Sequence, residues 1–262
     1  YQKFSIWNQS GQYDIFIAKF DFQDTLIWNL TIPYLGNGYD ISVEGFDSVG
    51  NMYLVGSFGN SEVTFGNDIL NGSNNYGADM LIVKVSTSGE YLWANTIGGG
   101  DINKITFDST GSSYVCGNRV SHVGLGWDGS MEYGLVAKIA ADGELIWENG
   151  FDDYGITCND LTVDNSDDLY IVGKFSGQGI FGEHSINETV DGSCSSGSCD
   201  DAFVAKIQSN GQWQWAKGVG SSEHDEATVV ETLGDGKVIV GGVASYEMQF
   251  GDYNLSIIYE II

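Results

Sequence analysis

The stretch DMLIVKVSTSGEYLW, residues 79–93, decides the fold, because the chain contains three further copies of the same pattern. In each copy an apolar segment ends at a lysine, a turn follows, and a tryptophan stands nine residues after the lysine. The pairs are Lys19 and Trp28, Lys84 and Trp93, Lys138 and Trp147, and Lys206 and Trp215. Self-similarity over such distances indicates a repeat architecture.

A second pattern lies between these copies and reads ISVEGFDSVGNMYLVGSF over residues 41–58. It recurs over residues 105–118 and 161–175, and in a looser form over residues 229–243. Each repeat therefore predicts four short strands, which in one copy are Ile41–Phe46, Met52–Phe58, Met80–Val85 and Tyr91–Ile97. Turn signals such as Ser88-Gly89 and Asn210-Gly211 predict a tight antiparallel hairpin from the third and fourth strands.

The predicted strands are apolar on both faces, as in Ile15-Phe16-Ile17-Ala18. A sheet of such strands has to be covered on both sides. The chain has no convincing helical stretch, so other sheets must provide the cover. We therefore predict an all-β fold, a β-propeller of four-stranded antiparallel blades. A β-solenoid is the alternative, although its repeat is usually much shorter.

The repeat resembles the SBBP-type β-propeller repeat family over nearly the whole chain. The residues that carry the resemblance are Asp14, Phe16, Ala18, Lys19, Trp28, Asp47, Gly50, Asn51, Tyr53, Val55 and Gly56, which recur most fully as Asp201, Phe203, Ala205, Lys206 and Trp215. The sequence departs from the pattern at Tyr133, at Cys116, and in the fourth copy of the second pattern, which lacks the aspartate. The resemblance implies secreted and surface proteins, and it implies no particular activity.

Residues 1–262 are expected to form one domain with repeat units of about 14–78, 79–132, 133–200 and 201–262. The chain opens with third and fourth strands and closes with first and second strands. Pairing of the two ends would close a ring of four blades; the alternative is a fragment of a larger ring. We favour the fragment, because residues 250–255 repeat the linker between second and third strands and residues 256–262 resemble another third strand.

The net charge of −26 makes this an acidic protein and argues against nucleic acid or anionic membranes as partners. No stretch of about 18 apolar residues predicts membrane insertion. We interpret the negative charge mainly as a means of keeping the protein soluble. No cofactor is expected; the candidate ions are calcium, on Asp164, Asp167 and Asp168, whose oxygens have the alternating spacing of calcium loops, and zinc on Cys194 and Cys199, which lack a second ligand pair. An ordinary hairpin turn explains the same residues, because they align with residues 47–51.

The four cysteines favour an oxidising compartment. Cys194 and Cys199 flank a short polar loop, and we predict that they form a disulfide. Cys116 lies within a second strand, where it acts as a small buried hydrophobe or forms a bridge to Cys158. The sequence does not decide between these two states.

The repeated lysines and tryptophans allow a functional and a structural interpretation. A ring of ammonium groups would bind an anion, and indole rings would stack on sugars. We favour structural roles, because a repeated position usually serves stacking between repeats. Asn71 and Asn187 are candidate glycosylation sites in long polar loops, which would make the chain a glycoprotein.

No catalytic motif is present, so we expect no enzyme. The function expected is that of an extracellular or cell-surface scaffold for adhesion, assembly or protein–protein interaction. Its partners would be other proteins or copies of itself. The alternatives are a carbohydrate-binding propeller, with glycans as partners, and a polysaccharide hydrolase or lyase, which would require two carboxylates in a central cleft.

Overall fold

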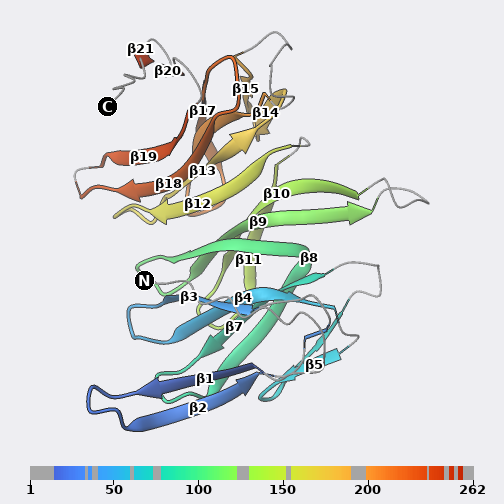
Figure 1. The fold of residues 1–262 in the computed structure, drawn as a ribbon, viewed down its shortest axis with the longest axis vertical. Helices are drawn as coiled ribbons and strands as arrows, with labels where there is room; N and C mark the ends of the chain where they lie inside the picture. Colours follow the sequence, from blue (N-terminus) through green and yellow to red (C-terminus); the bar gives the residue numbers. More distant parts are fainter. Residues whose placement is uncertain are drawn as a thin grey trace, which may run out of the picture.

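The computed structural model describes residues 15–32, 35–36, 41–59, 62–72, 78–122, 130–151, 155–189, 199–234, 236–244, 248–250 and 253–255. All its regular elements are strands, which confirms the predicted all-β class (Figure 1). The strands are β1 (Ile15–Phe20), β2 (Leu26–Ile32), β3 (Ile41–Phe46), β4 (Met52–Phe58), β5 (Glu62–Phe65), β6 (Asp68–Asn71), β7 (Asp79–Val85), β8 (Tyr91–Phe107), β9 (Ser113–His122), β10 (Ser130–Ile139), β11 (Leu145–Gly150), β12 (Thr157–Val163), β13 (Leu169–Phe175), β14 (Gln178–Phe181), β15 (His184–Asn187), β16 (Asp201–Ile207), β17 (Trp213–Gly220), β18 (Glu226–Thr232), β19 (Val238–Val243), β20 (Met248–Phe250) and β21 (Tyr253–Leu255).

The longer strands form three antiparallel four-stranded units. The first unit has the order β3-β4-β7-β8, the second β8-β9-β10-β11, and the third β12-β13-β16-β17. The strand β8 belongs to two units because its first half pairs with β7 and its second half pairs with β9. The sequence predicted two strands in this region, and the structure joins them into one.

Two hairpins complete the architecture. The N-terminal hairpin, β1–β2, corresponds to third and fourth strands, and the C-terminal hairpin, β18–β19, corresponds to first and second strands. They lie at opposite ends of the stack, with β1–β2 at the bottom of Figure 1 and β18–β19 near the top. In the structure these two hairpins belong to separate two-stranded sheets.

The units pack face to face, as the two-sided apolar strands predict. In β4, Leu54 faces the N-terminal hairpin, whereas its neighbour Tyr53 faces the second unit. In β16, Phe203 faces the second unit and Val204 faces the C-terminal hairpin. This alternation follows from the twofold period of a strand and gives one apolar cluster at every junction.

The linkers between second and third strands form small hairpins that the sequence did not predict. They are β5–β6, β14–β15 and β20–β21, of which β20–β21 pairs with β17. In the first two hairpins, Phe65 and Phe181 are fully buried and a glycine with positive φ follows each of them. The Phe-Gly pairs of the sequence therefore mark these turns.

A disulfide between Cys116 on β9 and Cys158 on β12 connects the second and third units, with the two Cα atoms 6.0 Å apart. Both residues are buried in the apolar cluster between these units. The bridge that the sequence left open is therefore present. Among the described residues, no helix is long and apolar enough to cross a membrane.

Candidate functional site

The repeated lysine and tryptophan meet the turn of the next unit. At the junction of the first and second units, Trp93 Nε1 donates to the carbonyl oxygen of Ala141 at 3.0 Å, and Lys84 Nζ donates to the same oxygen at 3.2 Å. The indole ring lies against Gly143, where an added Cβ would approach the ring to 2.8 Å. We call this arrangement the Trp–turn contact. It consists of a lysine and a tryptophan on one unit, and of a carbonyl and a glycine in the turn of the next.

The same contact occurs at two further junctions. Trp28 Nε1 and Lys19 Nζ donate to the Thr87 oxygen at 3.0 and 3.3 Å. Trp147 Nε1 and Lys138 Nζ donate to the Ser209 oxygen at 3.0 and 3.5 Å. The carbonyl always belongs to the residue three positions after the lysine of its own unit, and the glycine follows two positions later.

The turn glycines are required by both conformation and space. Gly89, Gly143 and Gly211 have φ of 85°, 95° and 90°, a region that residues with a Cβ seldom adopt. Each would also bring a Cβ within 2.7 to 3.1 Å of the facing tryptophan ring. The turn signal that predicted a hairpin thus also makes the contact between units.

An asparagine strengthens two of the three contacts. Asn95 and Asn149 each stand two residues after the tryptophan, and each donates at 2.7 Å to the carbonyl of the turn glycine of the next unit. The corresponding residue of the N-terminal hairpin is the buried Leu30.

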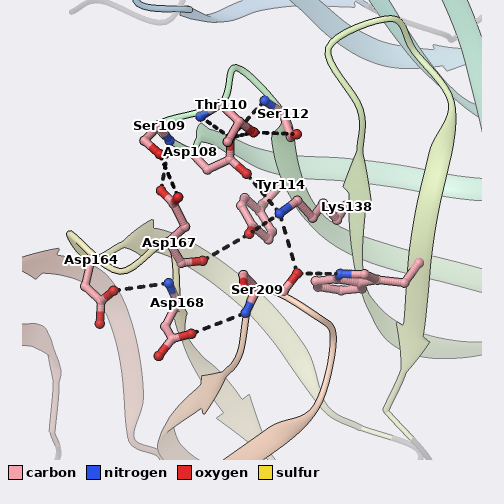
Figure 2. A network of polar contacts seen from close by, with 11 residues as sticks. Asp108, Ser109, Thr110, Ser112, Tyr114, Lys138, Asp164, Asp167, Asp168 and Ser209 are labelled. Carbon is pink, nitrogen blue, oxygen red and sulfur yellow. Dashed lines mark hydrogen bonds and ion pairs between the residues drawn. The ribbon is translucent and has the colours of Figure 1, made fainter.

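The lysine also contacts a carboxylate and a tyrosine on its own unit (Figure 2). Lys138 Nζ lies 2.9 Å from Asp108 Oδ2 and donates to Tyr114 Oη at 2.8 Å. The ammonium lies over the Tyr114 ring, 4.7 Å from its centroid. The side chains of Lys138 and Asp108 are only 11% and 1% exposed. The ion pair and the contact with the ring recur at Lys84, with Asp47 and Tyr53, and at Lys206, with Asp164 and Tyr170.

Burial and hydrogen bonding act in opposite directions on the pKa values of these charges. Burial opposes ionisation of Asp108, but hydrogen bonds from Thr110, Lys138 and Ser112 outweigh it and lower the pKa below 3.8. Burial also opposes the charge on Lys138, yet its contacts to Tyr114 and Asp108 raise the pKa above 10.5. Both groups therefore stay charged at neutral pH.

Hydrogen bonds between the hairpin turns connect the second and third units directly. Ser109 donates from its backbone nitrogen and from Oγ to the Asp167 carboxylate, at 2.8 and 2.7 Å. Tyr114 Oη donates to the Asp167 carbonyl at 3.0 Å (Figure 2). The side chains of Figure 2 hold two units together, and their ammonium and indole groups are engaged within the protein.

The predicted calcium ligands take part in these contacts. Asp164 and Asp168 lie 3.1 and 3.0 Å from Lys206 Nζ, and Asp167 binds Ser109. Among the described residues, no group of three or more His, Cys, Asp or Glu side chains is placed to hold a metal ion.

The remaining candidates are only partly within the described residues. Cys199 is disulfide-bonded, but Cys194 lies outside the described residues, so the Cys194–Cys199 bridge stays a prediction. Asn71 and Asn187 are exposed, and glycosylation of either stays a prediction. Their predicted loop location is wrong, because both are the last residues of short strands, β6 and β15. The paired linker hairpins explain this difference.

The Asp201 carboxylate has a raised pKa, in contrast to the lowered pKa of Asp108. The side chain is fully buried, and its Oδ2 accepts bonds from the Thr189 nitrogen and hydroxyl at 2.7 and 2.6 Å. Burial raises its pKa above 3.8, and the nearby charges of Asp225 and Glu188 raise it further. The ionised Asp201 side chain is therefore a cost to folding at neutral pH.

Sequence reasoning missed the tyrosines and the exact partners of the lysines. Tyr53, Tyr114 and Tyr170 occupy one repeat position, directly opposite the lysine on the paired strand. Their recurrence was visible in the second pattern, but only strand pairing shows which lysine each tyrosine meets.

Comparison of the chain with models of known protein families gave no match, and comparison with curated proteins gave none either.

Proposed function

We propose that the stacked units are blades of a β-propeller of the SBBP-type repeat, and that the chain is a non-enzymatic extracellular or cell-surface scaffold that binds other proteins. The face-to-face packing and the recurring Trp–turn contact support this architecture. The first strands of successive units also lie close together, as blades around an axis require, and β12 contacts both β8 and β18.

The observation that carries the binding role is an apolar face on the N-terminal hairpin. Phe16 is 72% exposed, whereas the residues at its repeat position in the three units, Leu81, Leu135 and Phe203, are buried. Phe20, Leu26 and Ile27 are also exposed, and Phe22 in the adjoining turn is 95% exposed. Phe16 and Phe20 thus expose large apolar side chains at positions that are buried in the three units, and exposed apolar surface of this kind marks protein interaction sites.

The edge of the same hairpin favours the same role. In each unit the third strand pairs with a second strand, but among the described strands β1 pairs only with β2. A free edge offers unpaired backbone groups to another chain, so the face and the edge together suit a protein partner. The tryptophans that motivated the glycan-binding alternative lie between units, and for this reason the scaffold is the function we propose.

The test compares the chain with a Phe16→Ser/Phe20→Ser variant, with Val49→Ser as the matched control, because Val49 is 75% exposed but lies outside this face. We expect the wild-type chain and the control to associate, with themselves or with proteins of the source organism's cell surface, in sedimentation and surface-binding assays. The double variant should lose that binding. A wild-type chain that stays monomeric and binds no surface protein would contradict the proposal.

A further inference from the structure

The third unit carries one half of a Trp–turn contact. Lys206, Trp215 and Tyr170 are placed as in the other units, with Lys206 Nζ over the Tyr170 ring at 4.8 Å and the Trp215 ring 6.0 Å from that of Tyr170. Within the described part of the chain, Trp215 Nε1 donates no hydrogen bond, whereas Trp28, Trp93 and Trp147 each donate one to a turn of the next unit. The C-terminal hairpin supplies first and second strands beside this unit, and it lacks the turn that the contact requires.

The three completed contacts define what fits against Trp215. Each uses a turn between third and fourth strands with glycine five residues after the lysine position. At these glycines a Cβ would lie 2.7 to 3.1 Å from the ring, closer than ordinary carbon contacts. The occupant of the Trp215 site is therefore a β-hairpin with glycine at this turn position.

The N-terminal hairpin of the chain itself does not meet this requirement. Five residues after Lys19 stands Asp24, with φ of 63° and a Cβ where the other turns have none. Asp21 closes the turn by accepting from the nitrogens of Gln23 and Thr25 at 2.8 and 2.9 Å, so the backbone is held in this shape. Trp215 would meet the Asp24 side chain instead of an open glycine.

The C-terminal hairpin contains a second, independent mismatch. Leu233 and Ile239 occupy the positions at which the units carry the aspartate and the tyrosine that hold the lysine, and Ile239 is more than half exposed. In the units, the tyrosine pairs directly with the lysine across two strands, as Tyr53 does with Lys84. We therefore expect a strand that pairs with β19 to carry an apolar residue at the lysine position. If β1 paired there, Lys19 would face Leu233 and Ile239 in place of an aspartate and a tyrosine.

We propose that Trp215 and the edge of β19, which among the described strands pairs only with β18, form a binding site for a hairpin of a further repeat unit. That hairpin carries glycine at the turn position and an apolar residue at the lysine position. The site rejects the N-terminal hairpin of this chain and of a second copy, so β18–β19 and β1–β2 are not two halves of one blade. This inference rests on the proposed function and specifies its partner at this end.

The test uses two synthetic peptides of residues 133–150, both with Lys138→Leu, and one with Gly143→Asp in addition. We expect the glycine peptide to shift the Trp215 indole N–H resonance of the chain and to slow its exchange with water. The aspartate peptide should bind about tenfold more weakly, as expected for an overpacked contact. A Trp215→Phe chain should bind the two peptides equally. Equal binding of both peptides to the wild-type chain, or an unmoved Trp215 signal, would overturn the proposal.

A second measurement covers the case of poorly folded peptides. The Lys19→Leu/Asp24→Gly variant removes both mismatches from the N-terminal hairpin, and it should form head-to-tail oligomers or a closed ring. The matched Lys19→Leu/Gln23→Gly variant, which keeps Asp24, should form neither. Head-to-tail contacts between β1 and β19 in the wild-type chain, or no difference between the variants, would overturn the inference. The Phe16→Ser/Phe20→Ser variant tests the proposed function at the other end of the stack. Failure of the proposed function can therefore be distinguished from failure of this inference.

Discussion

The Gly143→Ala substitution tests the Trp–turn contact through a single methyl group. The new Cβ would stand 2.8 Å from Trp93 Cδ2, on a backbone with φ of 95°. The conformation alone costs about 1–2 kcal/mol, and overpacking adds about 1–3 kcal/mol. We therefore expect the free energy of unfolding to fall by about 2–5 kcal/mol.

The control is Gly111→Ala, in a turn of the same type within the second unit. Its φ is 83°, but the nearest atom to an added Cβ is Ala141 Cβ at 3.9 Å, an ordinary contact. Only the conformational cost of about 1–2 kcal/mol applies there. Urea titrations followed by circular dichroism give both values.

A double-mutant cycle isolates the part of the cost that comes from the ring. In a Trp93→Ala background the clash is removed, so Gly143→Ala should cost no more than Gly111→Ala. The reasoning is refuted if the two glycine substitutions cost the same in the wild-type background, or if the cycle shows no coupling between Gly143 and Trp93.

Three further predictions concern the charges and the disulfide. Lys138→Met should lower the unfolding free energy by about 3–5 kcal/mol in urea titrations, because it leaves the buried Asp108 carboxylate without its lysine. Lys19 is exposed, so Lys19→Met should change the unfolding free energy little, and equal effects of the two substitutions would contradict this prediction. Reduction of the Cys116–Cys158 bridge, which closes 42 residues, should lower the unfolding free energy by about 2–4 kcal/mol, and a Cys116→Val/Cys158→Ala chain, which keeps Cys194 and Cys199, should lose this part of the response to reductant. Asp108 contributes stability above pH 3.8 that is lost as the pH falls through its lowered pKa, so the loss of unfolding free energy caused by Asp108→Asn should grow between pH 3 and 7. The raised pKa of Asp201 makes its contribution greatest below pH 3.8 and lost as the pH rises, so the loss caused by Asp201→Asn should shrink over the same range. Parallel pH profiles of the two variants would refute the assignment.

Most of the fold could be predicted from the repeat pattern. Strand positions, the hairpin at Gly89, and the need for sheets on both faces all follow from local signals that agree with one another. The continuity of β8 was not predictable, because Gly98 and Gly100 inside it have the positive φ that usually ends a strand. The pairing of the linkers was also hidden, since Glu62–Phe65 and Asp68–Asn71 are each only four residues long.

The contacts between units were less accessible from the sequence. The Lys84–Trp93 spacing marks a repeated position, but the acceptor at Ala141 lies in the following repeat and is a backbone atom. A carbonyl has no sequence signature, so spacing alone does not identify it. The sequence shows Asp24 at the position where the other turns have glycine. Only the structure shows that a tryptophan ring packs against each of those glycines, so that an aspartate there would be in the way.

Exchange of the indole N–H groups with water tests the Trp–turn contact most directly. After assignment by single Trp→Phe substitutions, the signals of Trp28, Trp93 and Trp147 should exchange slowly, because each N–H is bonded to a carbonyl of the next unit. The Trp215 signal should exchange fast in the isolated chain. Equal exchange rates at all four tryptophans would contradict the account.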